Sequence, residues 1–102
     1  MAIKSQVSEG GELLTISIDG RFDASSLDEF RKSYEDTDPS EIQRYVVDLE
    51  DTIHLDSSAL GMLLVLRDFA GGDQANITIS NCSPEVRKIF AISSFEQLFT
   101  IE

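Results

Sequence analysis

The sequence predicts an α/β fold, with a small mixed sheet of about four to five strands packed against three to four helices. Two observations lead to this prediction. Short runs of β-branched and aliphatic residues alternate with segments in which apolar residues recur at helical spacing. Turn and cap residues separate these segments and give the order β-β-α-β-α-β-α.

The first two strands are predicted at residues 3–7 and 13–18, joined as a hairpin by the glycine-containing turn between them. In the second strand Leu14, Ile16 and Ile18 share one face, because side chains alternate along a strand. That face is therefore expected to line the core.

The first helix is predicted to start near Ser26. Ser26 and Glu29 have the spacing of a capping box, in which each side chain bonds the backbone N–H of the other. Three apolar residues then recur at helical spacing and are expected to pack on the sheet: Leu27, Phe30 and Tyr34.

A strand–helix–strand unit follows. The strands are predicted at residues 45–49 and 76–80, and the helix at residues 57–70. Residues 50–55 are expected to form a loop. Gly71 is expected to end the helix, because glycine adopts the left-handed cap conformation readily.

The last helix is predicted to begin with Ser83 as N-cap and Pro84 at the first helical position. Residues 93–98 suggest one more short helical turn. Residues 99–101 suggest either a terminal strand or a cap on the core.

Composition predicts a single globular domain, residues 1–102, because 41% of the residues are hydrophobic and 26% are charged. A net charge of -11 argues against nucleic-acid binding, since phosphates would be repelled. The single cysteine, Cys82, is expected to be a small core residue and fits a cytoplasmic protein. Residues 1–5 lack a signal-peptide pattern, and the longest apolar run, residues 60–66, is too short for membrane insertion.

The most informative segment is residues 55–64. Asp56 is a preferred N-cap residue, which places Ser57 and Ser58 at the first helical positions. A helix N-terminus has free N–H groups and the positive end of the helix dipole, so it tolerates a phosphoryl group on a serine. The same spacing is equally that of an ordinary helix start.

Catalytic and metal chemistry have weaker support. Glu50, Asp51 and Asp56 form an acidic cluster that suggests a metal pocket, although such clusters are more often solvated loops. His54 is the only histidine, and no serine or cysteine is placed to form a nucleophile–base pair with it. We therefore expect no enzyme activity, metal or cofactor.

Three segments, in this order, resemble the STAS domain of bacterial anti-sigma factor antagonists. Residues 56–61, Asp-Ser-Ser-Ala-Leu-Gly, are similar to the family's phosphorylation motif, in which the first residue after the aspartate is the phosphoserine. That residue is Ser57, with Ser58 as the alternative. Residues 20–23, Gly-Arg-Phe-Asp, are similar to a second family motif whose aspartate, here Asp23, lies beside that serine. Residues 83–90 are similar to the segment that opens the last main helix.

The resemblance implies a STAS fold and a partner switch controlled by reversible serine phosphorylation. The unphosphorylated form would bind a serine kinase or anti-sigma factor. A PP2C-type phosphatase, or a response regulator carrying both activities, would reverse the modification. The closest pattern is that of gammaproteobacterial members that act on biofilm formation or motility. The expected partner-binding surface around the phosphosite consists of Asp23, Leu55, Asp56, Ser58, Ala59 and Met62.

The sequence departs from the family pattern at Ala59, where glycine is usual, and at His54, where an aromatic residue is common. Alanine is the better helix former, so the fold is not expected to suffer. The added methyl group is expected to narrow the space beside a phosphate. Two rival functions remain: a static STAS subunit of a membrane lipid ABC transport assembly, and a domain that senses a nucleotide or lipid.

Overall fold

The structure, a computed structural model, describes residues 3–102. Residues 1–2 of the segment considered for a signal peptide lie outside this range. The strands are β1 (Ile3–Val7), β2 (Leu13–Ile18), β3 (Gly20–Phe22), β4 (Arg44–Asp48), β5 (Thr52–Leu55), β6 (Ile77–Ser80) and β7 (Thr100–Ile101). The helices are α1 (Leu27–Lys32), α2 (Ser57–Phe69) and α3 (Pro84–Ile92), with short 3-10 turns at Ala24–Ser26, Gly72–Gln74 and Phe95–Gln97.

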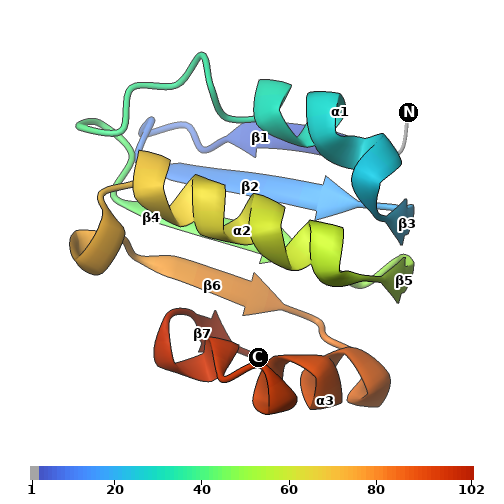
Figure 1. Cartoon of the computed structure of the whole chain (residues 1–102). Helices are drawn as coiled ribbons and strands as arrows, with labels where there is room; N and C mark the ends of the chain where they lie inside the picture. The colour runs from blue at the N-terminus through green and yellow to red at the C-terminus, as the bar shows by residue number, and fades with distance from the viewer. Residues whose placement is uncertain (1–2) are drawn as a thin grey trace.

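Five strands form the main sheet in the order β1-β2-β4-β6-β7 (Figure 1). β1 and β2 are antiparallel, whereas β2, β4, β6 and β7 are parallel to one another. The predicted mixed α/β sheet is therefore confirmed, including the hairpin at the start. Of the two alternatives for residues 99–101, the terminal strand forms, as β7.

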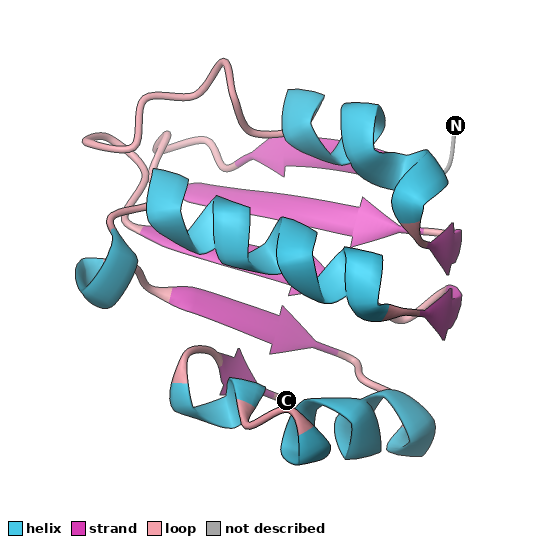
Figure 2. Ribbon diagram, in the orientation of Figure 1, coloured by secondary structure: helices cyan, strands magenta, loops and turns pink. Residues whose placement is uncertain are grey.

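Helices α1 and α2 contact each other and lie across one face of this sheet (Figure 2). Leu14, Ile16 and Ile18 of β2 are at most 1% exposed, as the alternation along the strand predicts. The apolar stripe of α2 is buried over the same sheet. Cys82 is half-buried beside this core, and burial raises the pKa of its thiol, which fits a packing residue better than a reactive one.

A second, two-stranded sheet lies beyond the ends of β2 and β4, where β3 pairs in parallel with β5 (Figure 1). The prediction that residues 50–55 form a loop was wrong, because β5 occupies most of that segment. Gly20 makes the turn out of β2 at a φ of 90°, a conformation that favours glycine. The buried Thr52 hydroxyl donates to the Ile18 carbonyl at 2.8 Å and fixes β5 to the end of the main sheet.

The helix starts are confirmed for α2 and α3. Asp56 caps α2, and the Ser83 hydroxyl accepts from the Val86 N–H at 3.2 Å at the start of α3. The predicted capping box of Ser26 with Glu29 is wrong. Ser26 instead pairs with Asp23, one turn earlier, because a 3-10 turn precedes α1.

Candidate functional site

Two aspartates lie side by side at the carboxyl end of the β3–β5 ribbon. Phe22 of β3 is in register with Leu55 of β5, and each is followed directly by a capping aspartate, Asp23 or Asp56. Parallel neighbouring strands are about 4.8 Å apart, so the two caps open onto the same small area. The expectation that Asp23 lies near the segment that carries Ser57 agrees with this register.

Asp23 is held in place by several donors. Its carboxylate accepts the Ser25 N–H at 3.0 Å and the Arg21 Nε–H at 3.1 Å. The Ser26 hydroxyl accepts the Asp23 N–H at 3.3 Å and donates to the Arg21 carbonyl at 3.1 Å. Hydrogen bonds from Ser25 and then Arg21 hold the pKa of the Asp23 carboxyl below its usual range. Asp23 is therefore a fixed negative charge at neutral pH.

Asp56 organises the start of α2. One of its carboxylate oxygens accepts the backbone N–H groups of Ser58 at 3.0 Å and Ala59 at 3.3 Å. Ser57 is the first residue of the helix, and both serine side chains are exposed. Ser57 thus presents a hydroxyl to solvent on a fixed backbone, which a modifying enzyme can reach.

Three of the residues expected around the phosphosite are buried instead of exposed. Leu55 and Met62 are 5% exposed and Ala59 is fully buried. The expectation that Leu55 and Met62 present an exposed surface was wrong, because Leu55 ends β5 inside the core and Met62 belongs to the buried stripe of α2. The Ala59 methyl group also packs into the core and does not narrow the space beside Ser57. In contrast, Val65 on α2 is 56% exposed.

A groove of about 400 Å³ runs between α1 and α2. Its floor is formed by Phe30, Tyr34 and Met62, and Leu27 and Val65 stand at its sides. Ser58 lines the groove near the start of α2. The groove therefore connects an apolar surface with the area around the two N-cap aspartates, Asp23 and Asp56.

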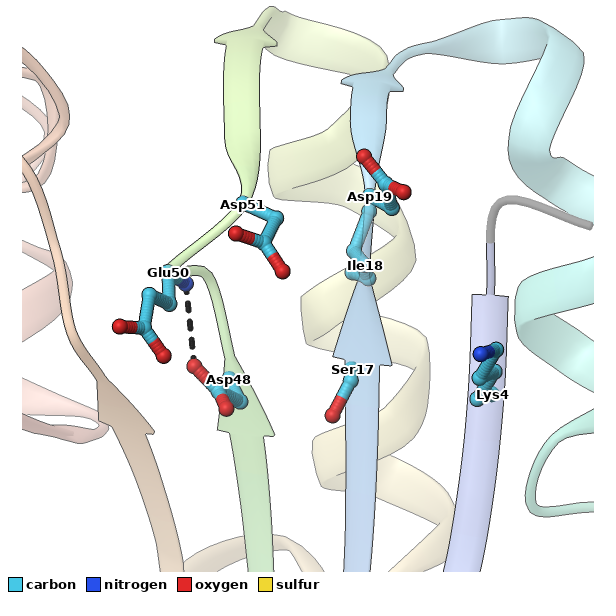
Figure 3. Close-up of a pocket in the computed structure, with 7 residues that line it drawn as sticks. All are labelled: Lys4, Ser17, Ile18, Asp19, Asp48, Glu50 and Asp51. Carbon is cyan, nitrogen blue, oxygen red and sulfur yellow. Dashed lines mark hydrogen bonds between the residues drawn. The ribbon is translucent and has the colours of Figure 1, made fainter.

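The three acidic residues that were weighed as a metal pocket and judged more typical of a solvated loop do not line one common cavity. Glu50 and Asp51 line a small polar cavity of about 120 Å³ between the ends of β2 and β4 (Figure 3). The Glu50 N–H donates to the Asp48 carboxylate at 3.0 Å in this cavity. Asp56 is not one of its lining residues, because it caps α2. Within residues 3–102, no group of three histidine, cysteine or acidic side chains is arranged to hold a metal.

Sequence reasoning missed one arginine, one histidine and one serine at this end of the molecule. Arg21 and His54 are exposed cross-strand neighbours, two positions before the aspartates, and Ser25 lies two positions after Asp23 as Ser58 does after Asp56. The repeated pattern of apolar residue, aspartate, any residue and serine is visible in the sequence. This repeat is the sequence signal that could have indicated that residues 20–25 and residues 52–58 form equivalent, neighbouring structures.

The family comparison matches almost the whole chain. A family model described as "Mlab, STAS domain" matches residues 5–100. The STAS-domain containing protein PA14_20770 of Pseudomonas aeruginosa is 58% identical over 101 residues, which cover 99% of both chains. No helix in residues 3–102 has both the length and the apolar character to cross a membrane.

Solved structures share the fold at low sequence identity. The anti-sigma factor antagonist SpoIIAA of Bacillus, in its phosphorylated form, has a TM-score of 0.74 at 19% identity, over 99% of this chain and 91% of SpoIIAA. Its unphosphorylated form also has a TM-score of 0.74. A sulfate transporter family protein from Wolinella succinogenes has a TM-score of 0.72 at 12% identity, over 93% of this chain and 80% of that protein. From the family match and the close relative together, the chain belongs to the STAS domain family.

Proposed function

We propose that the protein is a partner-switching regulator, similar to anti-sigma factor antagonists, whose binding state is set by phosphorylation of Ser57. The observation that supports this most is the exposed Ser57 at the start of α2, beside the two N-cap aspartates, Asp23 and Asp56. SpoIIAA, which shares the fold, occurs in an unphosphorylated and a phosphorylated form. Ser58 is the alternative acceptor, and its side chain is exposed as well.

The physical effect of the modification is local. A phosphoserine adds a charge of about -1.5 to -2 at pH 7, next to Asp23 and Asp56. The N-terminus of α2 offsets part of this repulsion, by about 0.3–1 kcal/mol at an exposed site. Arg21 lies beside Asp23 and supplies a nearby cation. The modification therefore changes the charge and bulk of the surface and leaves the fold intact.

The chain is proposed to be a substrate of enzymes and not an enzyme itself. A serine kinase, such as an anti-sigma factor with kinase activity, would bind the unphosphorylated form and modify Ser57. A PP2C-type phosphatase, or a response regulator that carries both activities, would restore the binding form. The pathway would be one that sets transcription, biofilm formation or motility in the cytoplasm, with residues 1–102 acting as a single STAS domain.

Affinity purification of tagged variants from the source cells, with copurifying proteins quantified, tests this proposal. Ser57→Ala is expected to retain the partner under all growth conditions, and Ser57→Asp to retain it only partly, because aspartate adds one charge and a shorter group. Ser58→Ala is the matched control and is expected to behave like the wild type. Equal partner recovery from Ser57→Ala, Ser57→Asp and wild type under all conditions would contradict the switch.

A second candidate function is that of a static subunit of a membrane transport assembly. It is supported by the fold, which a sulfate transporter family protein shares. In that case the two serines are ordinary helix-start residues. Stable copurification with a transport ATPase, unchanged by Ser57→Ala or Ser57→Asp, would favour this candidate over the switch.

A further inference from the structure

β1 is an edge strand of the main sheet, and within residues 3–102 no strand pairs with its outer side (Figure 1). The other edge strand of this sheet, β7, has only two residues, whereas β1 has five. β1 contains no proline, and its register with β2 is unbroken. The free N–H and C=O groups of such an edge are a template for another strand. β1 is therefore able to accept a further strand.

The groups that β1 presents outward follow from its pairing with β2. The Ser8 N–H donates to the Leu13 carbonyl at 2.9 Å, and hydrogen-bonded pairs alternate with non-bonded pairs along antiparallel strands. Gln6 and Lys4, two and four positions before Ser8, therefore bond to β2. The remaining residues of β1 direct their N–H and C=O groups away from β2: Ile3, Ser5 and Val7.

A groove of about 280 Å³ lies between this edge and α1. Ile3 and Ser5 form its β1 wall. The α1 wall consists of polar side chains: Asp28, Glu29, Lys32 and Ser33. Because side chains alternate along a strand, every second side chain of a strand added to β1 would face α1 and enter this groove. Val7, on the same face of β1 as Ile3 and Ser5, is 45% exposed and offers an apolar contact.

The α1 wall of this groove contains a carboxylate oxygen that lacks a donor. The Oε2 atom of Glu29 is buried and has no hydrogen-bond partner among the described residues. Lys32 lines the same wall, but in residues 3–102 it forms no ion pair with Glu29. A buried acceptor without a donor is costly, so a ligand that supplies a charged N–H group there removes this cost. A lysine or arginine of an added strand has the required charge and donors.

We propose that the outer edge of β1 is the docking site for an extended segment of a partner protein, which adds a strand to the main sheet and places a lysine or arginine beside Glu29. Such strand addition draws affinity from main-chain hydrogen bonds and specificity from alternate side chains. A second copy of the chain fits less well, because it brings two net charges of -11 together. The proposal goes beyond the proposed function, since it does not depend on the state of Ser57.

The direct test uses the whole chain and a synthetic peptide of about eight residues, with threonine at every second position and valine or lysine between. Amide hydrogen exchange, followed by NMR, reports where it binds. At saturating peptide we expect exchange of the Ser5 and Val7 amides to slow about tenfold or more, because they gain acceptors. The Lys4 and Gln6 amides, which already bond to β2, are expected to change less. A peptide with glutamates in place of the lysines is expected to bind about tenfold more weakly.

Ser5→Pro is the decisive variant for the strand edge, because it removes an outward N–H and leaves the bonds between β1 and β2 in place. It is expected to weaken the peptide about tenfold or more. Gln6→Ala is the matched control, which changes an exposed side chain on the opposite face of β1 and keeps every backbone donor. It is expected to bind like the wild type. The melting temperature of both variants shows whether they fold.

Glu29→Gln tests the charged contact, because it keeps the size of the side chain and removes its charge. It is expected to weaken the lysine-containing peptide about fivefold or more. Glu35→Gln is the matched control, which neutralises an exposed carboxylate that does not line the groove, and is expected to leave binding unchanged.

Slowed exchange elsewhere than along β1, no binding of the lysine-containing peptide, or unchanged binding by folded Ser5→Pro would overturn the proposal. If Ser5→Pro does not fold, Glu29→Gln decides, and unchanged peptide binding by that variant would overturn the proposal in the same way. A dimer of the chain alone that Ser5→Pro dissociates, seen by sedimentation, would overturn it in favour of a second copy as the occupant.

Discussion

At the scale of single residues, Asp23 and Asp56 have the same structural role, each as an N-cap directly after one of two neighbouring strands. Each follows a buried apolar residue and accepts the backbone N–H of the residue two positions later, at 3.0 Å in both cases. The two caps fix the backbone around Ser57. The site therefore consists of two N-capped helix starts, one at the 3-10 turn after β3 and one at α2. The phosphorylation motif covers only the second of them.

Asp56→Ala is expected to destabilise the protein by about 1 kcal/mol, because Ser58 and Ala59 lose the carboxylate that accepts their N–H groups. Urea unfolding measures this change. Asp51→Ala, which removes an exposed carboxylate that does not cap a helix, is the control and is expected to stay within about 0.5 kcal/mol of the wild type. Equal stability of the two variants would show that Asp56 is not a functional cap.

Tyr45 carries a second residue-scale prediction. Its side chain is 1% exposed and its buried hydroxyl has no hydrogen-bond partner, and burial raises its pKa above 10.0. The unfolded chain therefore loses the Tyr45 proton at lower pH than the folded protein does. This contribution to stability is complete below pH 10.0 and is lost as the pH rises through the folded pKa.

Tyr45→Phe is therefore expected to fold at neutral pH with equal or higher stability, by up to about 1 kcal/mol, since it removes an unpaired buried hydroxyl. Above about pH 10 it is expected to lose less stability than the wild type. Urea midpoints across this pH range measure both effects. A marked loss of stability at pH 7 would show that the hydroxyl has a partner after all.

At the scale of elements, α2 combines a buried stripe with a solvent-facing side. Its buried residues, Ala59, Met62, Leu63 and Leu66, hold it on the sheet. Gly61 weakens the same helix with no compensation in the protein's own packing.

Gly61→Ala is expected to raise the free energy of unfolding by about 1 kcal/mol and the melting temperature by about 4–8 °C. Gly71→Ala provides a control of opposite sign, because Gly71 has a φ of 119°, where alanine is strained. Thermal unfolding of both variants measures the pair. A lower melting temperature for Gly61→Ala would mean that the fold itself requires this glycine.

The elements that sequence reasoning predicted well are those specified locally. The ends of α2 follow from Asp56 and Gly71, and the start of α3 follows from Ser83 and Pro84, all of which act within one helical turn. β3 and β5 were missed because they have three and four residues and exist only through their pairing, about 30 positions apart in the chain. Such short strands have no periodicity to detect.

The candidate site was predictable only in part for the same reason. Resemblance to a family brought Asp23 and Ser57 together, and the register of β3 with β5 gives the physical basis. The exposure of Leu55 was misjudged because β5, which it ends, was not predicted, and that of Met62 because the orientation of α2 depends on its packing against α1 and the sheet. The neighbouring positions of Arg21 and His54 follow from a strand pair that was not predicted.

At the scale of the whole molecule, the proposed switch changes a surface and not the fold. Ser57 is exposed, and the core beneath it is closed by buried residues such as Ala59 and Leu63. A phosphoryl group is therefore expected to shift amide NMR signals near residues 21–25 and 54–61 and to leave those of β6 and α3 unchanged. Shifts spread through the core would contradict a local mechanism.

The measurement that tests the central claim most directly is intact-mass and peptide mass spectrometry of the protein purified from its source cells, with and without phosphatase treatment. The account predicts one phosphoryl group that phosphatase removes and that maps to Ser57. A modification on Ser58 with none on Ser57, or protein that stays unmodified under stress and in cells lacking the phosphatase, would contradict it.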